Sequence, residues 1–374
     1  MIMKILHIMF SVGWGGLEKY AIDQAVGMRE RGHEVSFIRR ANTETAKALF
    51  AMDFPGQEWA PLPYVDIMAM VRIRRAANEM GAGIIHAHHS ADLGLIFPAM
   101  IGLKQIKFIF STYMRIPRPK KDLYHRMEYG AVQRVLTLSD QMTENAQRNL
   151  PVAPHRIMTM PYGIRIENFD SSSIPKGEIR DKYQVPKDAP LIGIIGRLDP
   201  LKGQMEMIRA MPAIHAKFPN AVLALVGGET PELVGTYKPR LEKEVESLGL
   251  GKSVIFTGYS TNPALPLADL DVYVIPTDNE TFGMSAIEAM AMEAPVVGAD
   301  NGGLPEVLDH GACGLLANPR DPASLAQAVI RYLSDEDLRK TMSRKGREKA
   351  QRLYDRVKSM DRLEKIYQDT LSES

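Results

Sequence analysis

The chain has 374 residues, more than one ordinary hydrophobic core holds, so we expect two domains. Its 46 basic and 45 acidic residues leave a formal net charge of +1, which gives no overall attraction to nucleic acid or to an anionic membrane. The one cysteine, Cys313, excludes an intrachain disulfide and fits a reducing compartment.

The first half of the chain alternates between apolar strand patterns and amphipathic helix patterns. The apolar run at residues 1–10 is shorter than that of a secretory signal and meets glycines at once, so we expect a strand there. Strands that are apolar on both faces are typical of a parallel sheet covered by helices. Candidate strands are residues 4–10, 34–38, 83–87, 107–111 and 134–138, with helical segments at 17–31 and 64–80 between them. The longest apolar stretch, 93–103, is too short to span a bilayer.

The pattern loosens across residues 162–175, a polar stretch with glycine and proline that we interpret as a linker. It then restarts with candidate strands at residues 190–196, 221–227, 253–257, 271–275 and 294–298. The charged segment 353–371 has a helical pattern and no strand after it. We therefore predict two doubly wound α/β domains with a cleft between them.

A glycine turn at residues 12–18 follows the first strand and leads into a helix. Glycine allows the backbone to approach a ligand closely, and a helix start favours an anion. Gly15 and Gly16 are candidate binding residues on this basis, although the segment is not a dinucleotide-binding fingerprint and ordinary turn chemistry is the alternative.

Two histidines lie on one face of the third strand, because side chains alternate along a strand. Neither Cys nor a pair of Asp residues stands nearby at ligand spacing, so we do not predict a metal site. We interpret His86 as a core histidine and His88, at the carboxyl end of the strand, as a candidate site residue.

The segment from Lys104 to Lys121 contains six basic residues and no acidic one, with aromatic residues between them. Arg72, Arg74 and Arg75 form a second basic cluster in the same domain. The segment is either a solvated loop or a surface for an anionic acceptor or membrane, where each cation contributes about 1 kcal/mol. It matches no nucleic-acid-binding module, so we expect no nucleic acid partner.

The second domain opens with a strand that ends at Gly196, followed by Arg197, a loop with proline, and Lys202 before the next helix. Ligands bind beyond the carboxyl ends of parallel strands, so Arg197 and Lys202 are candidates to neutralise a diphosphate. Charge-assisted hydrogen bonds of this kind contribute about 1.5–3 kcal/mol each. The Walker A pattern is absent, which argues against an NTPase.

Residues 279–288 place two carboxylates, Glu280 and Glu288, on either side of a small-residue turn that opens a helix. The first amide N–H groups of a helix lack intrahelical acceptors and favour phosphate. A carboxylate on each side could bind the hydroxyl groups of a sugar and of a ribose, as in a nucleotide sugar. A capped helix with two solvated glutamates is the alternative.

Together these motifs resemble those of retaining glycosyltransferases of the GT-B fold, in glycosyltransferase family 4. The matching pieces occur in family order and cover nearly the whole chain: residues 15–18, 31–35, 85–88, 196–197, 202–203, 280–288 and 302–306. The resemblance implies an acceptor-side domain at 1–170, a nucleotide-sugar-binding domain at 171–352 and a helix at 353–374 that crosses back onto the first domain.

The resemblance also implies residue roles. His88 would lie beside the transferred sugar, and Gly15 and Gly16 would approach the donor or the acceptor. Arg197 and Lys202 would contact the diphosphate, and Glu280 the hydroxyls of the donor sugar. The remaining binding residues would be Phe282, Gly283 and Met284 through their amides, Glu288 at the ribose, and Gly258 and Tyr259 near the base. No metal or other cofactor is expected.

The activity implied is transfer of a hexose, with retention, from a nucleoside diphosphate sugar to a glycan or lipid-linked acceptor. We expect a cytoplasmic enzyme of cell-envelope polysaccharide or lipopolysaccharide synthesis, in contact with the inner face of the membrane if the basic segment docks. Two departures, Tyr113 in place of a common histidine and the linker start Tyr162–Arg165, bear on the acceptor side. A sugar-nucleotide 2-epimerase and a non-catalytic binding protein are the alternatives.

Overall fold

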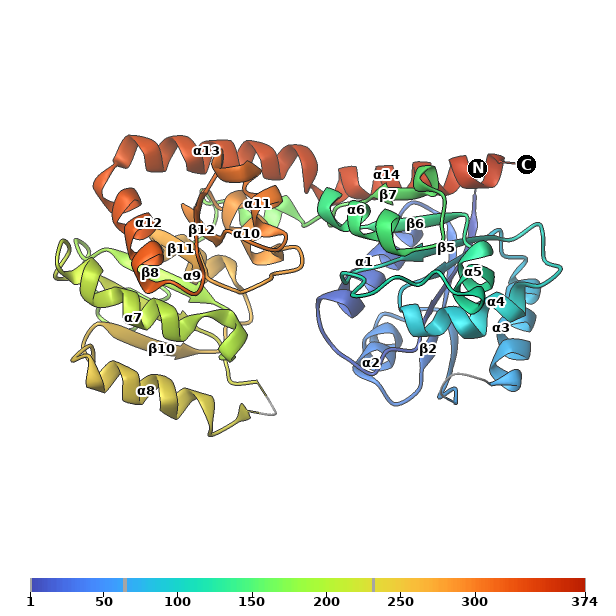
Figure 1. The fold of residues 1–374 in the computed structure, drawn as a ribbon, viewed down its shortest axis with the longest axis horizontal. Coiled ribbons are helices and arrows are strands. Elements are labelled where there is room, and N and C mark those ends of the chain that lie inside the picture. Colours follow the sequence, from blue (N-terminus) through green and yellow to red (C-terminus); the bar gives the residue numbers. More distant parts are fainter. Residues whose placement is uncertain (1, 63–65, 231–232, 374) are drawn as a thin grey trace. The chain divides into compact units, whose positions relative to one another are not determined.

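The computed structural model describes residues 2–62, 66–230 and 233–373, and the chain divides into two compact units (Figure 1). The first unit comprises Met1–Tyr162 and Val357–Ser374, and the second comprises Gly163–Arg356. Each unit has one parallel sheet with helices on both faces. The predicted class of two doubly wound α/β domains is confirmed.

The first sheet has seven strands in the order β3-β2-β1-β4-β5-β6-β7. The chain winds outward from β1 in one direction and from β4 in the other, which is the arrangement of a doubly wound sheet. The strands are β1 (Lys4–Met9), β2 (Glu34–Arg40), β3 (Gly56–Trp59), β4 (Ile84–Ala87), β5 (Lys107–Ser111), β6 (Arg134–Thr137) and β7 (Ile157–Thr159). The helices are α1 (Gly16–Glu30), α2 (Glu44–Ala51), α3 (Ile67–Met80), α4 (Leu93–Met100), α5 (Leu123–Gly130), α6 (Asp140–Asn149) and α14 (Arg356–Ser372).

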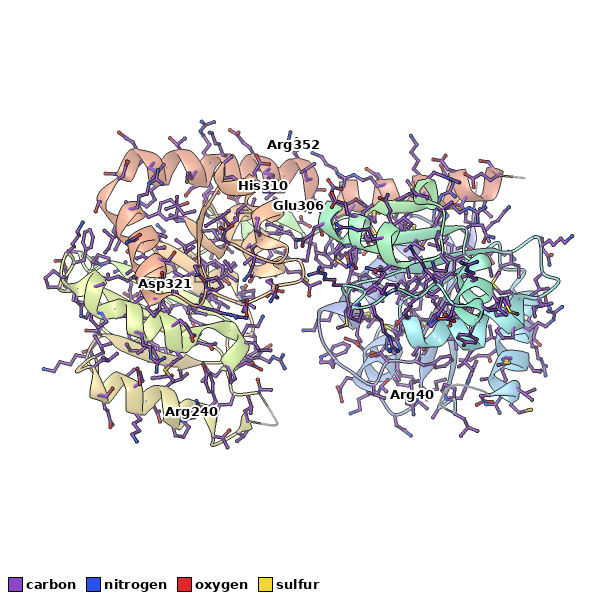
Figure 2. All side chains as sticks on the ribbon, in the orientation of Figure 1. Arg40, Arg240, Glu306, His310, Asp321 and Arg352 are labelled. Carbon is purple, nitrogen blue, oxygen red and sulfur yellow. The ribbon has the colours of Figure 1, made fainter. Side chains whose placement is uncertain are left out.

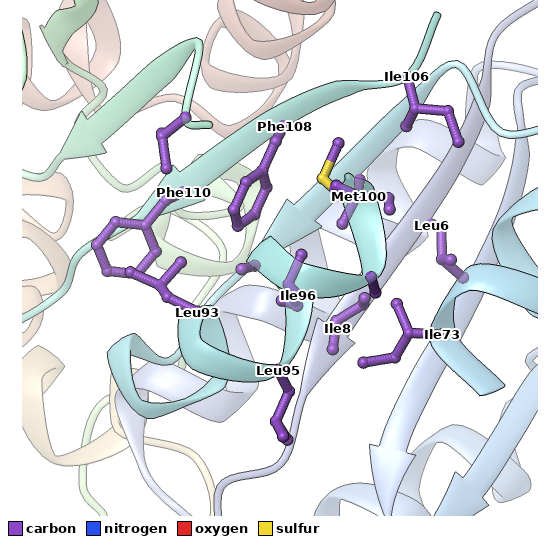
Figure 3. Packing of buried hydrophobic residues seen from close by; sticks show 14 of the residues in the cluster. Leu6, Ile8, Ile73, Leu93, Leu95, Ile96, Met100, Ile106, Phe108 and Phe110 are labelled. Atoms are coloured by element: carbon purple, nitrogen blue, oxygen red, sulfur yellow. The ribbon is translucent and has the colours of Figure 1, made fainter. Parts of the chain in front are cut away.

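Alternation along β1 divides the first core into two layers. Leu6 and Ile8 face α3, α4 and α5, where Ile96 and other residues of α4 pack against Phe108 on β5 (Figure 3). Ile5 and Met9 face the opposite layer, which α1, α2 and α14 cover. Because both faces of the strand are buried, its sequence is an almost continuous apolar run.

The C-terminal helix α14 belongs to the core of the first unit, as the resemblance implied. Met360, Leu363 and Tyr367 are fully buried against residues of β1 and α1. At the surface Arg31 donates to Asp361 at 2.9 Å. The helix predicted over residues 353–371 is confirmed as α14, which begins at Arg356, three residues later than expected, because the preceding helix α13 ends at Leu353.

The second sheet has six strands in the order β10-β9-β8-β11-β12-β13. The core side chains of α7, α8 and α12 cover one face of it. The strands are β8 (Leu191–Ile195), β9 (Val222–Val226), β10 (Val254–Gly258), β11 (Val272–Ile275), β12 (Val296–Ala299) and β13 (Leu315–Ala317). The helices are α7 (Gln204–His215), α8 (Tyr237–Ser247), α9 (Ala264–Asp269), α10 (Met284–Ala291), α11 (Leu304–Val307), α12 (Pro322–Ser334) and α13 (Glu336–Leu353).

Side-chain caps fix several helix starts in both units. Asp321, marked in Figure 2, accepts a hydrogen bond from the amide of Ala323 at 2.9 Å, and proline follows at the first position of α12. This is a favoured helix start, because the proline lacks the N–H that would have no partner there. Within the described ranges, no helix has the length and apolar character needed to cross a membrane.

All ten predicted strands are present, with ends that differ by at most two residues. Three further strands, β3, β7 and β13, were not predicted. Each has three or four residues and lies at an edge of its sheet, so it carries too short a pattern to stand out. The expected domain division at residue 170 differs from the boundary of the compact units, which falls between Tyr162 and Gly163. Tyr64, the predicted start of a helix, lies outside the described residues.

Candidate active site

The predicted donor residues of the second unit follow the carboxyl ends of adjacent parallel strands. Arg197 comes two residues after β8, Lys202 ends a short 3-10 helix (Pro200–Lys202) before α7, and Glu280 lies between β11 and α10. Because β8 pairs with β11 in parallel, these loops lie at the same edge of the sheet.

Two glycines allow these loops to pack against each other. Gly203 has a φ of +71°, and a Cβ there would lie 2.3 Å from the carbonyl oxygen of Pro276. Gly302 has a φ of +64°, and a Cβ there would lie 2.3 Å from the carbonyl oxygen of Glu280. That same carbonyl accepts a hydrogen bond from the amide of Gly303 at 2.7 Å. The backbone of Glu280 is therefore fixed against the turn that precedes α11, and larger residues do not fit.

Lys202 and Glu280 form an ion pair in this structure. Lys202 Nζ lies 3.0 Å from Glu280 Oε2, and the two side chains are 30% and 22% exposed. The sequence placed the lysine at a diphosphate and the glutamate at sugar hydroxyls. The structure brings the two together, so each neutralises the other while both remain within reach of solvent.

Arg197 is exposed at the same edge. Within the described part of the chain, no group accepts a hydrogen bond from its guanidinium. Its backbone carbonyl accepts a hydrogen bond from Gln204 Nε2 at 2.8 Å. Gln204 is fully buried at the start of α7, and its Oε1 has no partner among the described residues. A buried amide therefore fixes the backbone of Arg197 and leaves its cationic group free.

The start of α10 presents amide groups beside the ion pair. Gly283 precedes the helix with a φ of +94° and contributes no side-chain cap. Among the described residues, none accepts a hydrogen bond from the amides of Phe282, Gly283 or Met284. Phe282 is 5% exposed and packs edge-to-face on Tyr354, which holds the turn in place. An anion is favoured at such a helix start.

Tyr273, on β11, lies buried beneath this site. Its hydroxyl donates to the carbonyl oxygen of Ile195 at 3.4 Å and also hydrogen-bonds with Ser285 on α10. Burial raises the pKa of Tyr273, and the carboxylates of Glu288 and Glu280 raise it further. The hydroxyl therefore stays protonated and connects the end of β8 with the start of α10. Glu288 is half-buried on α10 within electrostatic range of it.

Gly258 and Tyr259 line a small pocket of about 30 Å³ at the end of β10. Gly258 has a φ of +77°, and Tyr259 is 77% exposed, so an aromatic surface is available for stacking. Lys182 and Tyr183 line the same pocket, and the Tyr183 hydroxyl donates to the carbonyl oxygen of Thr257 at 3.2 Å. The sequence offered no reason to single out either of these two residues.

In the first unit, the side chain of Glu18 caps the glycine turn that precedes α1. Glu18 is 5% exposed and folds back over the turn. It accepts hydrogen bonds from the amide of Gly15 at 2.8 Å and from Ser11 Oγ at 2.5 Å. This carboxylate satisfies the amide of Gly15, while the backbone of Gly16 remains exposed, and the binding role of the two glycines stays a prediction.

His88 lies in a buried chain of hydrogen bonds. It is 1% exposed, with its Nε2 2.7 Å from His7 Nδ1 and its Nδ1 2.7 Å from the Tyr113 hydroxyl. His86 is fully buried between Tyr367 and Ser111, as expected of a core histidine. The side chain of His88 therefore does not reach the domain surface here, and its role beside the sugar stays a prediction.

The three histidines, His7, His86 and His88, lie close enough for their ligand atoms to be within 4.8 Å of one another. The rings of His7 and His88 are nearly parallel, at 3°, and hydrogen-bond directly, so a metal would have to separate them. Burial lowers the pKa of His7 to about 3 and holds the pKa values of His86 and His88 well below 6.5. The cluster is therefore neutral at physiological pH.

Comparison with known proteins identifies the family of this chain. Residues 14–168 match the family described as Glycosyltransferase Family 4, and residues 175–349 match Glycosyl transferases group 1. A D-inositol 3-phosphate glycosyltransferase of Corynebacterium kroppenstedtii is 31% identical over 389 residues, which cover 96% of this chain and 86% of the relative. The chain belongs to glycosyltransferase family 4.

Other relatives of this glycosyltransferase extend the comparison. An N-acetyl-alpha-D-glucosaminyl L-malate synthase of Bacillus anthracis is 25% identical over 374 residues, covering 96% of this chain and 95% of the relative. A glycosyltransferase from Rickettsia africae shares the fold with a TM-score of 0.89 and 20% identity, each chain covered fully. Anabaena HepE, solved with UDP, has a TM-score of 0.86 and 21% identity and covers 98% of this chain and 100% of its own.

Within the second unit of this glycosyltransferase, the structure brings Lys202 and Glu280 together and places Arg197 and the start of α10 at the same edge. Sequence reasoning missed Gln204 and Tyr273, which hold these groups. A polar residue inside an otherwise apolar strand is the one signal that could have indicated Tyr273. Gly15, Gly16 and His88 belong to the first unit.

Proposed function

We propose that this glycosyltransferase moves a hexose from a nucleoside diphosphate sugar to a glycan or glycolipid acceptor, with retention of configuration. The observation that carries the proposal is the Lys202–Glu280 ion pair beside the free guanidinium of Arg197 and the unpaired amides at the start of α10. These groups offer positive charge for a phosphate and a carboxylate for sugar hydroxyls within one loop cluster.

The relatives support this assignment. Those at 25–31% identity are named for transfer to inositol phosphate and to malate, and one is named GDP-mannose-dependent. HepE was solved with UDP-glucose, and a further neighbour of the same fold is a lipopolysaccharide outer core galactosyltransferase. We assign the same type of donor to this chain and place it in cell-envelope or lipopolysaccharide synthesis, working on the cytoplasmic face of the membrane.

In the proposed reaction, the bond between the anomeric carbon and the donor phosphate oxygen breaks while the acceptor oxygen bonds to that carbon on the same face. The acceptor proton passes to an oxygen of the departing phosphate. Arg197, Lys202 and the amides of Phe282–Met284 stabilise the negative charge that develops there. Glu280 orients the sugar through its hydroxyls and forms no covalent intermediate. Two cationic side chains fill the role that a metal has elsewhere, so we propose that no metal is needed.

Glu288 is assigned to the ribose, and Gly258 and Tyr259 to the base. The exposed ring of Tyr259 suits stacking, and the pocket beside it is lined by Lys182 and Tyr183. Which base binds is decided by hydrogen bonds at this pocket. Acceptor binding is assigned to the first unit.

The test begins with the donor. Thermal unfolding in the presence of UDP-, GDP- and ADP-sugars should single out one nucleotide, because a ligand that binds only the folded state at 100 times its Kd stabilises it by about 2.7 kcal/mol. Nucleotide release from that donor is then measured with a panel of glycan and glycolipid acceptors. Release that depends on an acceptor supports transfer. Conversion of the sugar nucleotide without any acceptor would indicate an epimerase, and binding without turnover would indicate a non-catalytic protein.

A further inference from the structure

We propose that the first unit carries a membrane-docking face at the loop after β5 and the first turns of α5, and that its partner is an anionic lipid bilayer. We call it the α5 face. Its apolar members are Met114, Leu123, Tyr124 and Met127, and its cations are Arg115, Arg118 and Lys121.

The apolar members are unusually exposed for their size. Met114 is 68% exposed, Leu123 76%, Tyr124 57% and Met127 53%. Leu123 and Met127 are four residues apart on α5, so they share one side of the helix, and Tyr124 lies beside them. The buried side of the same helix carries Tyr129. Single exposed apolar residues are ordinary, but four within fourteen residues, three of them on one short helix, are a local concentration of the kind that marks an interaction site.

The cations of the α5 face are free. The described residues offer no ion pair or hydrogen bond to the charged groups of Arg115, Arg118 and Lys121, and all three side chains are exposed. The acid exposed among them, Asp122, is used at the start of α5, where it accepts a hydrogen bond from the amide of His125 at 3.1 Å. The face therefore combines apolar side chains with an excess of positive charge, the composition of a surface that lies in the interface of an anionic membrane.

The loop that carries these cations is held in place. Ile116 is buried, and its amide donates to Asn145 Oδ1 at 2.8 Å. The amide of Lys120 donates to the carbonyl oxygen of Asn149 at 2.8 Å. Both partners are on α6, so the loop is anchored at two points and the exposed side chains between them are presented from a fixed backbone.

This face differs from the segment predicted from the sequence, Lys104 to Lys121. The strand β5 within that segment is buried, and Lys107 Nζ donates to the carbonyl oxygen of Glu373 at 2.5 Å, which removes it from any docking surface. The sequence boundary stopped at Lys121, two residues before the apolar turn of α5. The predicted segment contains the cations of the face and Met114, but the other three apolar side chains, Leu123, Tyr124 and Met127, lie beyond it on α5.

The position of the α5 face suits a lipid-linked acceptor. The loop after β5 leaves the carboxyl edge of the sheet, the edge from which His88 follows β4, the neighbour of β5. Ligands of parallel sheets bind at this edge. An enzyme docked there would hold the acceptor end of the domain at the lipid surface.

A second copy of the chain is a poor occupant for the same face. In a symmetric dimer, each patch meets an identical patch, so the free cations of one copy would approach those of the other. Like charges in contact oppose association, whereas anionic headgroups neutralise them.

The test measures co-sedimentation of the full chain with vesicles, in the absence of donor and acceptor. We expect binding to vesicles of phosphatidylcholine mixed with phosphatidylglycerol, little binding to phosphatidylcholine alone, and loss of binding at about 0.5 M salt, where the screening length falls to about 4 Å. Arg118→Gln with Lys121→Gln should lower the partition coefficient about 25-fold, since each cation near such a surface contributes about fivefold. Leu123→Ser with Met127→Ser should lower it at least tenfold.

Matched variants elsewhere serve as controls. Lys243→Gln with Lys252→Gln removes the same charge from exposed positions of the second unit that have no ion pair with any described residue. Phe50→Ser removes an apolar side chain that is 80% exposed on α2. Both should bind within about twofold of the unchanged protein, a difference that corresponds to about 0.4 kcal/mol. Unfolding midpoints of all variants should coincide, because every altered residue is exposed.

Three outcomes would overturn the proposal: no binding to anionic vesicles, equal losses in the α5 and control variants, or a concentration-dependent dimer that the α5 variants abolish. The inference builds on the proposed lipid-linked acceptor but fails separately from it. Transfer to a water-soluble acceptor should be unchanged in the α5 variants, so lost vesicle binding with intact turnover concerns docking alone.

Discussion

Substitutions that break the Lys202–Glu280 ion pair should distinguish its contribution to stability from its contribution to catalysis. At the observed 3.0 Å, with an effective dielectric constant of about 20, the Coulomb attraction is about 5.5 kcal/mol before desolvation is subtracted. Hydrogen bonds to charged groups contribute about 1.5–3 kcal/mol, and fully exposed pairs at most about 1 kcal/mol. Since both side chains are about one quarter exposed, we expect a coupling free energy of about 1.5 kcal/mol.

The measurement is a double-mutant cycle with Lys202→Met, Glu280→Gln and both together. Urea unfolding gives the free energy of unfolding, and nucleotide release from the preferred donor gives turnover. If Lys202 contacts the departing phosphate, Lys202→Met should lower kcat by about 10²–10³-fold, and the double variant should be slower than Glu280→Gln alone.

The control is Lys238→Met on α8, which breaks an ion pair with Glu242 that has a similar Nζ–Oε1 distance of 3.3 Å but is more exposed. It should change the free energy of unfolding by less than about 1 kcal/mol and leave turnover unchanged. A double variant that is no slower than Glu280→Gln would refute the phosphate contact, because Lys202 would then act only by holding the glutamate.

Three further predictions concern groups that hold the site or the fold. Tyr273→Phe removes the hydroxyl between β8 and α10, so it should lower the free energy of unfolding by about 1 kcal/mol and donor affinity about tenfold; unchanged donor titrations would contradict this positioning role. Gly302→Ala should destabilise by about 2 kcal/mol or more, because its φ is positive and its Cβ would meet the Glu280 carbonyl, whereas Gly251→Ala, in open space, should be near neutral in urea unfolding. The buried histidines bind protons more weakly in the folded state, so the free energy of unfolding is full above pH 6.5 and falls as the pH drops toward 3, by up to about 4 kcal/mol per pH unit if all three take part. His86→Asn should reduce that slope in urea titrations at several pH values. A flat profile would show that the histidines are not neutral in the fold.

The central strands could be predicted from the sequence because burial on both faces leaves long apolar runs, as in β1. The short edge strands β3, β7 and β13 could not, because three or four residues carry no distinctive pattern. Pairing within the sheet, not local preference, makes them strands.

The charged residues of the site were predictable for a related reason. Arg197, Lys202 and Glu280 each follow an apolar strand, where a parallel sheet exposes its ligand-binding edge. The contacts between candidate site residues could not be predicted, because they join parts of the chain that are far apart in sequence. His7 and His88 are 81 positions apart, and Lys202 and Glu280 are 78 apart. Glu18 was visible in a motif, but only the backbone geometry of Gly15 shows that its carboxylate turns back onto the loop.

The position of α14 in the chain has a consequence for biosynthesis. The hydrophobic layer of the first unit needs Leu363 and Tyr367, which leave the ribosome only after the whole segment Gly163–Arg356. At typical rates of 5–20 residues per second, the nascent first unit waits roughly 10–40 s with only α1 and α2 on that side of its sheet. Translation that stops just after Arg356 would therefore release a chain whose second unit is complete and whose first unit exposes apolar surface, a natural target for chaperones and proteases.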